Sequence, residues 1–427
     1  MSESSPFLEG LRVVECSMLE PGTLGMVLAG FGADVIKVEQ PGQGDYVRQM
    51  AWPFVDGVSL LHWHVNRGKR SIALDLNNAA GKAVFVDLAR SADVVIEGMR
   101  PGALERKGIG PHELHRENPR LIFVTLSGYG VDGPYRDLPS HGVAYDAWAG
   151  VARPQFDEEG RPYIADGTPV GTRTAPVWAA AAVMAALIRA RARGQGAVID
   201  VAQTDAAAIT NWLAIEGEKA YTRPADHVTG NPSDRGVRRA PGLAGMEDAV
   251  RYQFYRSRDG MVLFMASERE FWRNFCSGIG RTDLFSRYPG ERYADHARGN
   301  DVLRAELEEI FATRTTAEWL EFANRVNTPI CPVNDAKSIL SDEQFAYRLP
   351  FEPAEEAGAD LMPLPVHLVG EQLPRMRKAP RVGEHTAEIL REVLGYAPEL
   401  VDGLRIDGAF GDLDLDPDRD VDRDLSS

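Results

Sequence analysis

The residues best suited to chemistry gather around a turn-rich segment that precedes a long alanine-rich helix. The turn spans residues 166–171 and leads directly to Thr172. Thr174 is a suitable N-cap and Pro176 suits a first helical turn, so the sequence predicts a helix that begins near Thr174 and ends at Gly194. A loop that brings a side chain to a helix N-terminus can support chemistry on an anion. An ordinary core helix would have the same pattern.

Four basic residues form a second group of candidates. Lys69 and Arg70 open a predicted strand, and Arg100 and Arg106 flank a Pro-Gly turn. Cations of this kind hold phosphate groups through charge-assisted hydrogen bonds. Taken singly, a lysine or arginine of this kind is more often a solvated surface charge or a helix-end cation than a ligand-binding residue.

Two further polar residues lie in turns. Glu20 follows the first predicted strand in a Glu-Pro-Gly turn. It either points into a site or is a turn residue that the dipole of the next helix favours. His141 lies in a Ser-His-Gly turn, where a lone histidine is more typical of a loop hydrogen bond than of catalysis.

Composition and charge limit the possible functions. At 427 residues the chain is long enough for two domains. Its net charge of −16 argues against a nucleic-acid or anionic-membrane partner, because both are polyanions. Three scattered cysteines indicate a reducing compartment and show no metal-ligand spacing. The N-terminus lacks the features of a signal peptide and no apolar run is long enough to span a bilayer, so we expect a cytoplasmic protein.

The first half alternates short apolar strands with helices, which predicts βαβ units, a mostly parallel sheet and ligands at the carboxyl ends of its strands. Strands are expected at 11–16, 34–39, 71–76, 93–97, 121–126 and 197–201, and helices at 23–31 and 81–92.

The character of the sequence changes beyond about residue 222. Two strands at 252–255 and 261–265 and helices at 268–279, 300–311 and 316–327 predict a smaller α+β domain over 230–340. A last helix is expected at 386–394, and the acidic tail 411–427 has the composition of a disordered segment.

A series of short phrases, in order and over almost the whole chain, resembles the family III CoA-transferases. This group includes formyl-CoA and crotonobetainyl/carnitine CoA-transferases and α-methylacyl-CoA racemases. The phrases lie at 32–39, 66–75, 100–104, 118–122, 127–130, 133–135, 259–260, 332–334 and 379–386.

The resemblance implies an α/β fold: a Rossmann-like large domain built from both chain ends, with a smaller α+β domain between them. The large domain would comprise 1–225 and a returning segment, 345–410. Two subunits would be threaded through one another as an interlocked dimer, and coenzyme A thioesters would be substrates, with no permanently bound cofactor.

Site residues follow from the same resemblance. In the family, basic residues that contact CoA match Lys69, Arg70 and Arg106. Arg100 matches such a residue less closely. We expect Lys69, Arg70 and Arg106 to form one basic pocket. Gly98 and Met99 depart from the Asn and aromatic residue that relatives often carry. Glu20 lies where relatives tend to have Gly-Pro.

The family transferases use an aspartate nucleophile that forms anhydride and thioester intermediates. Ungapped alignment of the alanine-rich helix puts Thr172 in that position, so the aspartate is absent. Three alternatives remain open. A gap could bring Asp166 into the position, Asp146 could supply the carboxylate, or Thr172 could itself act, although its ester would trap the acyl group.

His141 falls where the racemase branch keeps a catalytic histidine, which works with the aspartate that is missing here.

The leading expectation is transfer of CoA between organic acids, carboxylic or dicarboxylic. This chain would act as a homodimer or as the partner of an aspartate-containing paralogue, as in benzylsuccinate-type CoA-transferases of two related subunits. The alternatives are an acyl-CoA racemase or isomerase and a non-catalytic CoA-binding protein.

Overall fold

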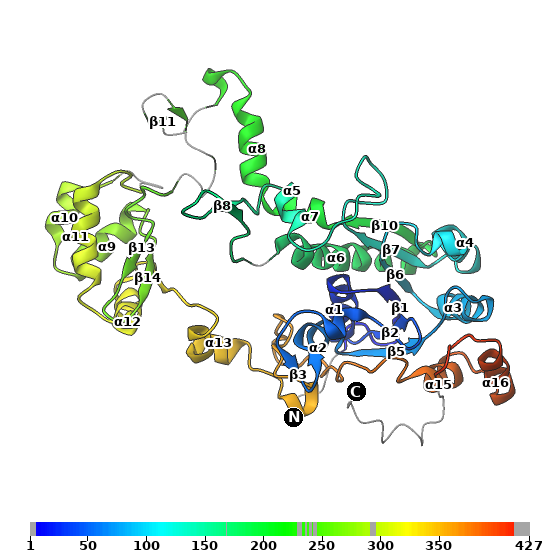
Figure 1. The fold of residues 1–427 in the computed structure, drawn as a ribbon. Helices are drawn as coiled ribbons and strands as arrows, with labels where there is room; N and C mark the ends of the chain where they lie inside the picture. The colour runs from blue at the N-terminus through cyan, green and yellow to red at the C-terminus, as the bar shows by residue number, and fades with distance from the viewer. Residues whose placement is uncertain are drawn as a thin grey trace. The chain divides into compact units, whose positions relative to one another are not determined.

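The computed structural model describes residues 6–167, 169–228, 233–234, 237–238, 241, 246–290 and 296–413. The chain divides into two compact units (Figure 1). The larger unit contains residues 1–211 and 347–427, and the smaller unit contains residues 212–346. The acidic tail that we expect to be disordered lies, from residue 414 onward, outside the described residues.

The larger unit is built on a six-stranded parallel sheet. In the order of the sheet its strands are β10 (Ala197–Ala202), β7 (Ile122–Ser127), β6 (Val94–Gly98), β1 (Arg12–Ser17), β2 (Asp34–Glu39) and β5 (Lys69–Ala73). All six predicted strands are therefore confirmed. The first strand lies in the middle, and the chain winds outward from it in both directions. The order reverses between β1 and β6, and open α/β sheets bind ligands at such switch points, at the carboxyl ends of the strands.

Alternate side chains of the strands enter two separate apolar cores. Val14, Ile36 and Ile72 pack on the face covered by α3 (Ala79–Ser91), α4 (Pro111–Glu117) and the C-terminal helical turns. Val13, Val35 and Val124 pack on the opposite face, under α1 (Thr23–Gly30) and α6 (Val170–Arg193). Burial of both faces explains why these strands read as continuous apolar runs.

Helix α6 begins at Val170, four residues before the predicted start. Its N-terminus is capped from a distance, because Asp146 Oδ1 accepts hydrogen bonds from the backbone N–H groups of Val170 and Gly171, both at 3.0 Å. Pro176 therefore lies inside the helix. Since proline has no N–H, it cannot donate the usual hydrogen bond to the carbonyl of Thr172.

By length and composition alone, the 24 residues of α6 could cross a membrane, contrary to our expectation that no segment was long enough. The helix nevertheless packs against the sheet through buried small side chains. Ala175, Ala179 and Val183 have no exposed surface, and Leu187 is buried with them in the core under β7 and β10. These contacts are those of a core helix.

The C-terminal part of the chain returns to the sheet and lies along β5. Gly68 N–H donates to the carbonyl of Arg377 at 2.7 Å, and the N–H of Ala73 donates to Thr386 Oγ1 at 3.1 Å. The predicted last helix is a turn of α-helix, α15 (Thr386–Glu388), continued by a π-helical turn (Ile389–Val393). Residues from both ends of the chain thus form one unit.

Short elements complete the larger unit. They are η1 (Glu20–Gly22), η2 (Tyr46–Gln49), β3 (Phe54–Val55), β4 (Val58–Ser59), α2 (Leu60–Asn66), η3 (Glu105–Lys107), α5 (Ala144–Trp148), β8 (Gln155–Phe156), β9 (Pro162–Tyr163), α7 (Gln203–Thr210), α14 (Ala354–Ala357) and α16 (Pro398–Ile406).

The smaller unit has an antiparallel sheet of β13 (Gln253–Arg256), β14 (Met261–Phe264) and β15 (Ile330–Pro332). Helices α9 (Arg269–Gly278), α11 (Asp301–Phe311) and α12 (Thr316–Val326) pack on it around an aromatic core that includes Trp272, Phe275 and Trp319. The predicted strands and helices of this region are confirmed within two residues. Its other elements are α8 (Trp212–Tyr221), η4 (Ala225–His227), β11 (Ser233–Asp234), β12 (Val237–Arg238), α10 (Thr282–Arg287), η6 (Ser338–Ser341) and α13 (Glu343–Arg348, which ends in the larger unit).

Candidate active site

A cavity of about 220 Å³ opens at the carboxyl edge of the parallel sheet. Its lining comes from the ends of several strands and the loops that follow them, and includes Ser17, Glu39, Tyr46, Asn77, Met99 and Lys107. Ser17 ends β1, and Met99 follows the neighbouring strand β6. The cavity therefore lies at the switch point of the sheet, where a doubly wound fold is expected to bind its ligand. We call it the edge cavity.

Lys107 is the cation of the edge cavity, and our sequence reasoning missed it. It ends η3, and its Nζ donates to Asn77 Oδ1, which lines the same cavity. Among the described residues this neutral amide is its one hydrogen-bond partner, so the lysine can offer its charge to a ligand. The adjacent Arg106, which we had singled out in the same short segment, could have led us to it.

Arg100 and Arg106 lie on the surface near this edge, and both are exposed. Arg106 Nη1 donates to the carbonyl of Pro101 at 3.0 Å. Neither arginine has a carboxylate partner in the described parts of the chain. Both keep donors that could reach a phosphate.

Lys69 lies elsewhere, and its placement contradicts the expectation of a surface cation. Its side chain has no exposed surface, and Nζ donates to Glu15 Oε1 at 2.8 Å, to the carbonyl of Gly22 at 2.7 Å and to Asn66 Oδ1 at 3.0 Å. Burial lowers the pKa of Lys69 to about 8, against the attraction of Glu15. All three donors of the ammonium group are occupied inside the protein, so none remains for a ligand.

Arg70 is also engaged inside the fold. Its Nε and Nη2 contact the two carboxylate oxygens of Asp34 at 2.9 and 2.5 Å, and Nη1 contacts Glu388 Oε1 at 2.9 Å. The guanidinium joins β5 to β2 and to the returning C-terminal segment. Carboxylates distant in sequence thus neutralise Lys69 and Arg70, so in this structure neither residue offers a free charge to the expected basic pocket with Arg106.

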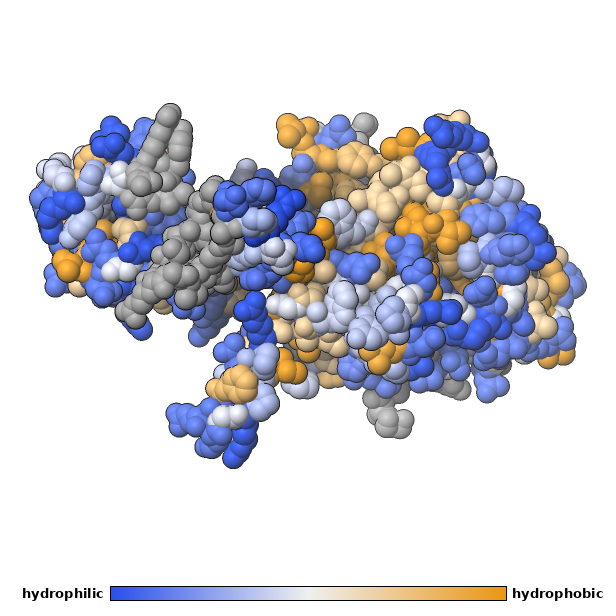
Figure 2. All heavy atoms as spheres, turned by 90° about the horizontal axis from the view of Figure 1, so that it is seen from above, coloured by the Kyte–Doolittle hydropathy of each residue, from blue (hydrophilic) through white to orange (hydrophobic). Residues whose placement is uncertain are grey.

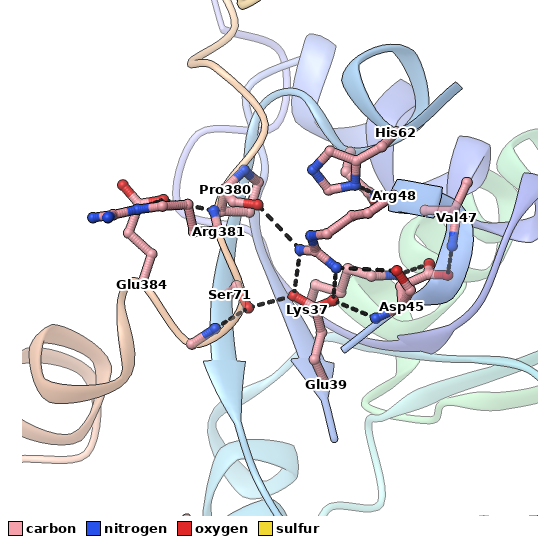
Figure 3. A network of polar contacts seen from close by, with 12 residues as sticks. Lys37, Glu39, Asp45, Val47, Arg48, His62, Ser71, Pro380, Arg381 and Glu384 are labelled. Carbon is pink, nitrogen blue, oxygen red and sulfur yellow. Dashed lines mark hydrogen bonds and ion pairs between the residues drawn. The ribbon is translucent and has the colours of Figure 1, made fainter. Parts of the chain in front are cut away.

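A network of buried ion pairs supports the wall of the edge cavity (Figure 3). Lys37 Nζ contacts Asp45 Oδ2 at 3.0 Å, and Arg48 binds Glu39 through both nitrogens of its fork, at 2.6 and 3.0 Å. Burial alone would raise the pKa of Glu39, but Arg48 lowers it to about 2. Ser71 Oγ donates to Glu39 at 2.5 Å. These contacts fix the loop that follows β2 against β5.

Thr172 lies in the first turn of α6, and only 3% of its surface is exposed. Its hydroxyl is 3.4 Å from the carbonyl oxygen of Pro169, a weak hydrogen bond at best. Asp146, which caps the same turn, is 2% exposed, and its buried Oδ2 has no hydrogen-bond partner among the residues that the structure describes. The fold thus brings a carboxylate to the turn that contains Thr172, although that carboxylate already serves the helix as its cap.

Glu20 contacts the start of α6. Its Oε1 lies 3.1 Å from Nη2 of Arg173, the residue after Thr172. Burial raises the pKa of Tyr145, and the charges of Tyr129, Glu20 and Tyr46 raise it further; Tyr46 also lines the edge cavity. Glu20 therefore points toward the same turn as Thr172. Arg173 was not among our candidates.

His141 and Asp166 lie on the exposed surface. The imidazole of His141 makes no hydrogen bond or ion pair to any residue that the structure describes. Asp166 lines a second cavity, of about 670 Å³, together with Asp146 and Pro169. Among the described residues no group of three or more His, Cys, Asp or Glu side chains could hold a metal ion.

Comparison with known proteins identifies the family of this chain. The family model for CoA-transferase family III matches residues 8–386. The beta subunit of succinyl-CoA–L-malate CoA-transferase from Chloroflexus aurantiacus is 31% identical over 406 residues, which cover 93% of this chain and 96% of that protein. Acetyl-CoA:oxalate CoA-transferase from Acetobacter aceti is 29% identical, with 93% and 100% covered, and human alpha-methylacyl-CoA racemase is 29% identical, with 94% and 96% covered.

Solved structures agree with this assignment. The crystal structure of Rv3272 from Mycobacterium tuberculosis matches with a TM-score of 0.74 and 26% identity, covering 90% of this chain and 99% of that one. A CAIB/BAIF family protein from Brucella suis matches with a TM-score of 0.72 and 26% identity, covering 92% and 100%. The parallel sheet, the edge cavity at its switch point and the match over nearly the whole length lead to one conclusion: the chain belongs to the family III CoA-transferases.

Proposed function

We propose that this chain transfers coenzyme A between organic acids in the cytoplasm as the subunit of a heteromeric transferase that lacks the nucleophile. The observation that carries the proposal is Thr172, a buried hydroxyl in the first turn of α6. An aspartate there could form an anhydride as reactive as the thioester with which it exchanges, whereas a threonine ester would be stable. Chemistry through a covalent intermediate would then require a carboxylate from a second chain.

The edge cavity is the proposed site of the CoA nucleotide. Lys107 and Asn77 would bind phosphate oxygens there, with Arg100 and Arg106 close by on the surface. Such contacts are strong because the acceptor is charged. On a protein with a net charge of −16, a local group of cations is needed to offset the repulsion of several phosphates.

Assembly with a second chain is supported by the surface of the larger unit. Exposed apolar side chains on α6, β10 and α7 are Val177, Trp178, Ile188, Val198 and Ile209. Figure 2 shows apolar side chains gathered on a face of this unit. Extended apolar surface of this kind marks an interface with another protein. A homodimer or a pair with an aspartate-containing paralogue would cover it, and the relative from C. aurantiacus carries the name of a beta subunit.

Racemisation of an acyl-CoA is the competing function. It would require a proton carrier on each face of the α-carbon. His141 is one candidate, and the human racemase is among the relatives. A threonine hydroxyl is too weak an acid and too weak a base to carry this proton near neutral pH, however. The carrier at position 172 is therefore missing, and transfer is the better supported proposal.

The test is a mass measurement on the purified chain after incubation with succinyl-CoA and then hydroxylamine. We expect no change in mass, because no activated carboxylate forms. The variant Thr172→Asp should form an adduct that hydroxylamine traps, whereas the control Thr174→Asp, two residues further along the helix, should not. Mixing the chain with a paralogue that has an aspartate at the matching position should give full transfer. An adduct of the unmodified chain at Asp146 or Asp166 would refute the proposal.

A further inference from the structure

Arg173 occupies an unfavourable position for a purely structural cation. It lies in the first turn of α6, directly after the buried Thr172, and its side chain is 44% exposed. The positive end of the helix dipole disfavours a cation in this turn. An arginine placed there calls for an anion beside it.

Glu20 supplies that anion only in part. The one contact between the two residues is Nη2 to Oε1 at 3.1 Å, and in the described part of the chain Arg173 has no other ion-pair or hydrogen-bond partner. A guanidinium has five N–H donors arranged to bind a carboxylate with two parallel hydrogen bonds. Most of the donors of Arg173 therefore remain available to a ligand.

The backbone that carries Glu20 is held in a strained conformation. Leu19 has φ 60° and ψ −145°, a region that only glycine enters freely. The carboxylate of Asp45 accepts a hydrogen bond from the Leu19 N–H at 3.3 Å and is itself anchored by Lys37 at 3.0 Å. Strain of this kind persists where the surrounding structure enforces it, and it is concentrated at functional sites.

The positive charge of Arg173 also acts on a neighbouring side chain. Burial and, to a lesser extent, the positive charges of Arg67 and Arg173 lower the pKa of His64 to about 4, so this imidazole is neutral at pH 7. Arg67 is itself balanced in part, because the charge of Glu352 acts on it. Beside Arg173, in contrast, Glu20 is the one carboxylate within ion-pair distance among the described residues.

From these observations we infer that Arg173 binds the free carboxylate of a dicarboxylic acyl group, with Glu20 as the positioning residue that orients the guanidinium before the ligand arrives. The inference rests on the proposed function, because the acyl group must arrive as a CoA thioester. It makes Arg173 a specificity residue: an acyl chain that ends in a carboxylate would gain two hydrogen bonds, and one that ends in a methyl group would gain none.

The test compares succinyl-CoA with butyryl-CoA, whose four-carbon acyl chains differ in ending with a carboxylate or a methyl group. Titration calorimetry on the full chain should give a preference for succinyl-CoA of about tenfold or more. Arg173→Gln should abolish the preference and leave butyryl-CoA affinity unchanged. Arg173→Lys should keep part of it, because the charge remains but the fork is lost. Arg193→Gln, at the other end of the same helix, is the matched control and should change neither affinity.

Two results would overturn the inference alone: equal affinity of the unmodified chain for the two esters, or an equal loss of both in Arg173→Gln. Failure of the unmodified chain to bind either ester would overturn the proposed function, and this inference with it. Glu20→Gln sharpens the assignment, because a positioning role predicts weaker binding of succinyl-CoA alone. Unchanged binding of succinyl-CoA in that variant would show that Glu20 does not position Arg173.

Discussion

Lys69 and Lys107 both lie in the larger unit, yet their surroundings differ in almost every respect. Lys69 is buried, and its three donors bind Glu15, Gly22 and Asn66. Lys107 lines the edge cavity and has one neutral partner, Asn77. The buried lysine holds strands and loops together, whereas the lysine of the cavity has a free capacity to bind. A basic residue can thus recur in a family for its partners inside the fold rather than for a ligand.

The arginines repeat the comparison. Arg70 is enclosed by Asp34 and Glu388, while Arg106 donates, among the described residues, to the backbone carbonyl of Pro101 alone. Charge and sequence context are similar in the two cases. What separates them is the number of carboxylates that the fold brings to each guanidinium. The following predictions test that division.

The largest effect is expected for Lys69→Met. This change leaves the buried carboxylate of Glu15 with Lys37 at 3.3 Å as its remaining cation. Removing one partner of a buried ion pair costs about 3–5 kcal/mol. Chemical denaturation should show this loss, and Lys107→Met should leave the stability unchanged. Equal stability of the two variants would remove the distinction between the lysines.

Glu39→Gln should destabilise the larger unit in a manner that depends on pH. The folded-state pKa of Glu39 is lowered from 4.5 to about 2, and this difference corresponds to about 3 kcal/mol. Because the pKa is lower in the folded state, this contribution is present above pH 4.5 and is lost as the pH falls toward 2. Thermal unfolding of both proteins between pH 7 and pH 2 should show their difference shrink in that window. A difference that stays constant would mean that packing, not the ion pair, is responsible.

Lys107→Met should weaken CoA binding while the fold stays intact. A hydrogen bond to a charged phosphate contributes about 1.5–3 kcal/mol, which is about tenfold or more in affinity. Calorimetry with CoA measures the effect, and Lys337→Met, an exposed lysine of the smaller unit, is the control. Arg70→Ala, in contrast, should lower stability without changing CoA affinity in the molecules that fold. If Arg70→Ala weakened CoA binding and Lys107→Met did not, Arg70 would be the residue that binds CoA and Lys107 would be excluded.

The smallest effect is expected for Arg106→Gln. Its side chain is exposed, and exposed charges contribute at most about 1 kcal/mol and are screened by salt. CoA affinity should fall less than about fivefold at low ionic strength, and the difference should vanish in 0.5 M NaCl. A tenfold loss that persists in salt would instead place Arg106 within the binding site itself.

The sequence contained enough information to locate the strands and most helices, because apolar runs and helical spacing are local properties. It did not show where α6 begins, since its cap is Asp146, which precedes Val170 by 24 positions. Thr174 and Pro176 are typical of a helix start, but the cap by the distant Asp146 lets the helix begin four residues earlier, at Val170.

The site was harder to predict than the fold, for the same reason. The partners of Arg70 are Asp34 and Glu388, which lie 36 and 318 positions away, and no local pattern reveals them. Arg173 escaped notice because its role depends on Glu20, which approaches it from the loop after β1. Residue type alone identifies cations that could bind a ligand. The fold shows which of these cations are already neutralised by carboxylates of the protein.

The return of the C-terminal segment to β5 has a consequence for the synthesis of the protein. Ser71 Oγ accepts a hydrogen bond from the N–H of Gly383 at 2.9 Å, and Arg48 Nη2 reaches the carbonyl of Pro380 at 3.1 Å. A ribosome makes these partners more than 300 residues after the strand that needs them. Throughout that interval the outer edge of β5 is open to pairing with other nascent chains. The larger unit is complete only when translation is almost finished, so a chain that stops before residue 380 leaves the outer edge of β5 uncovered.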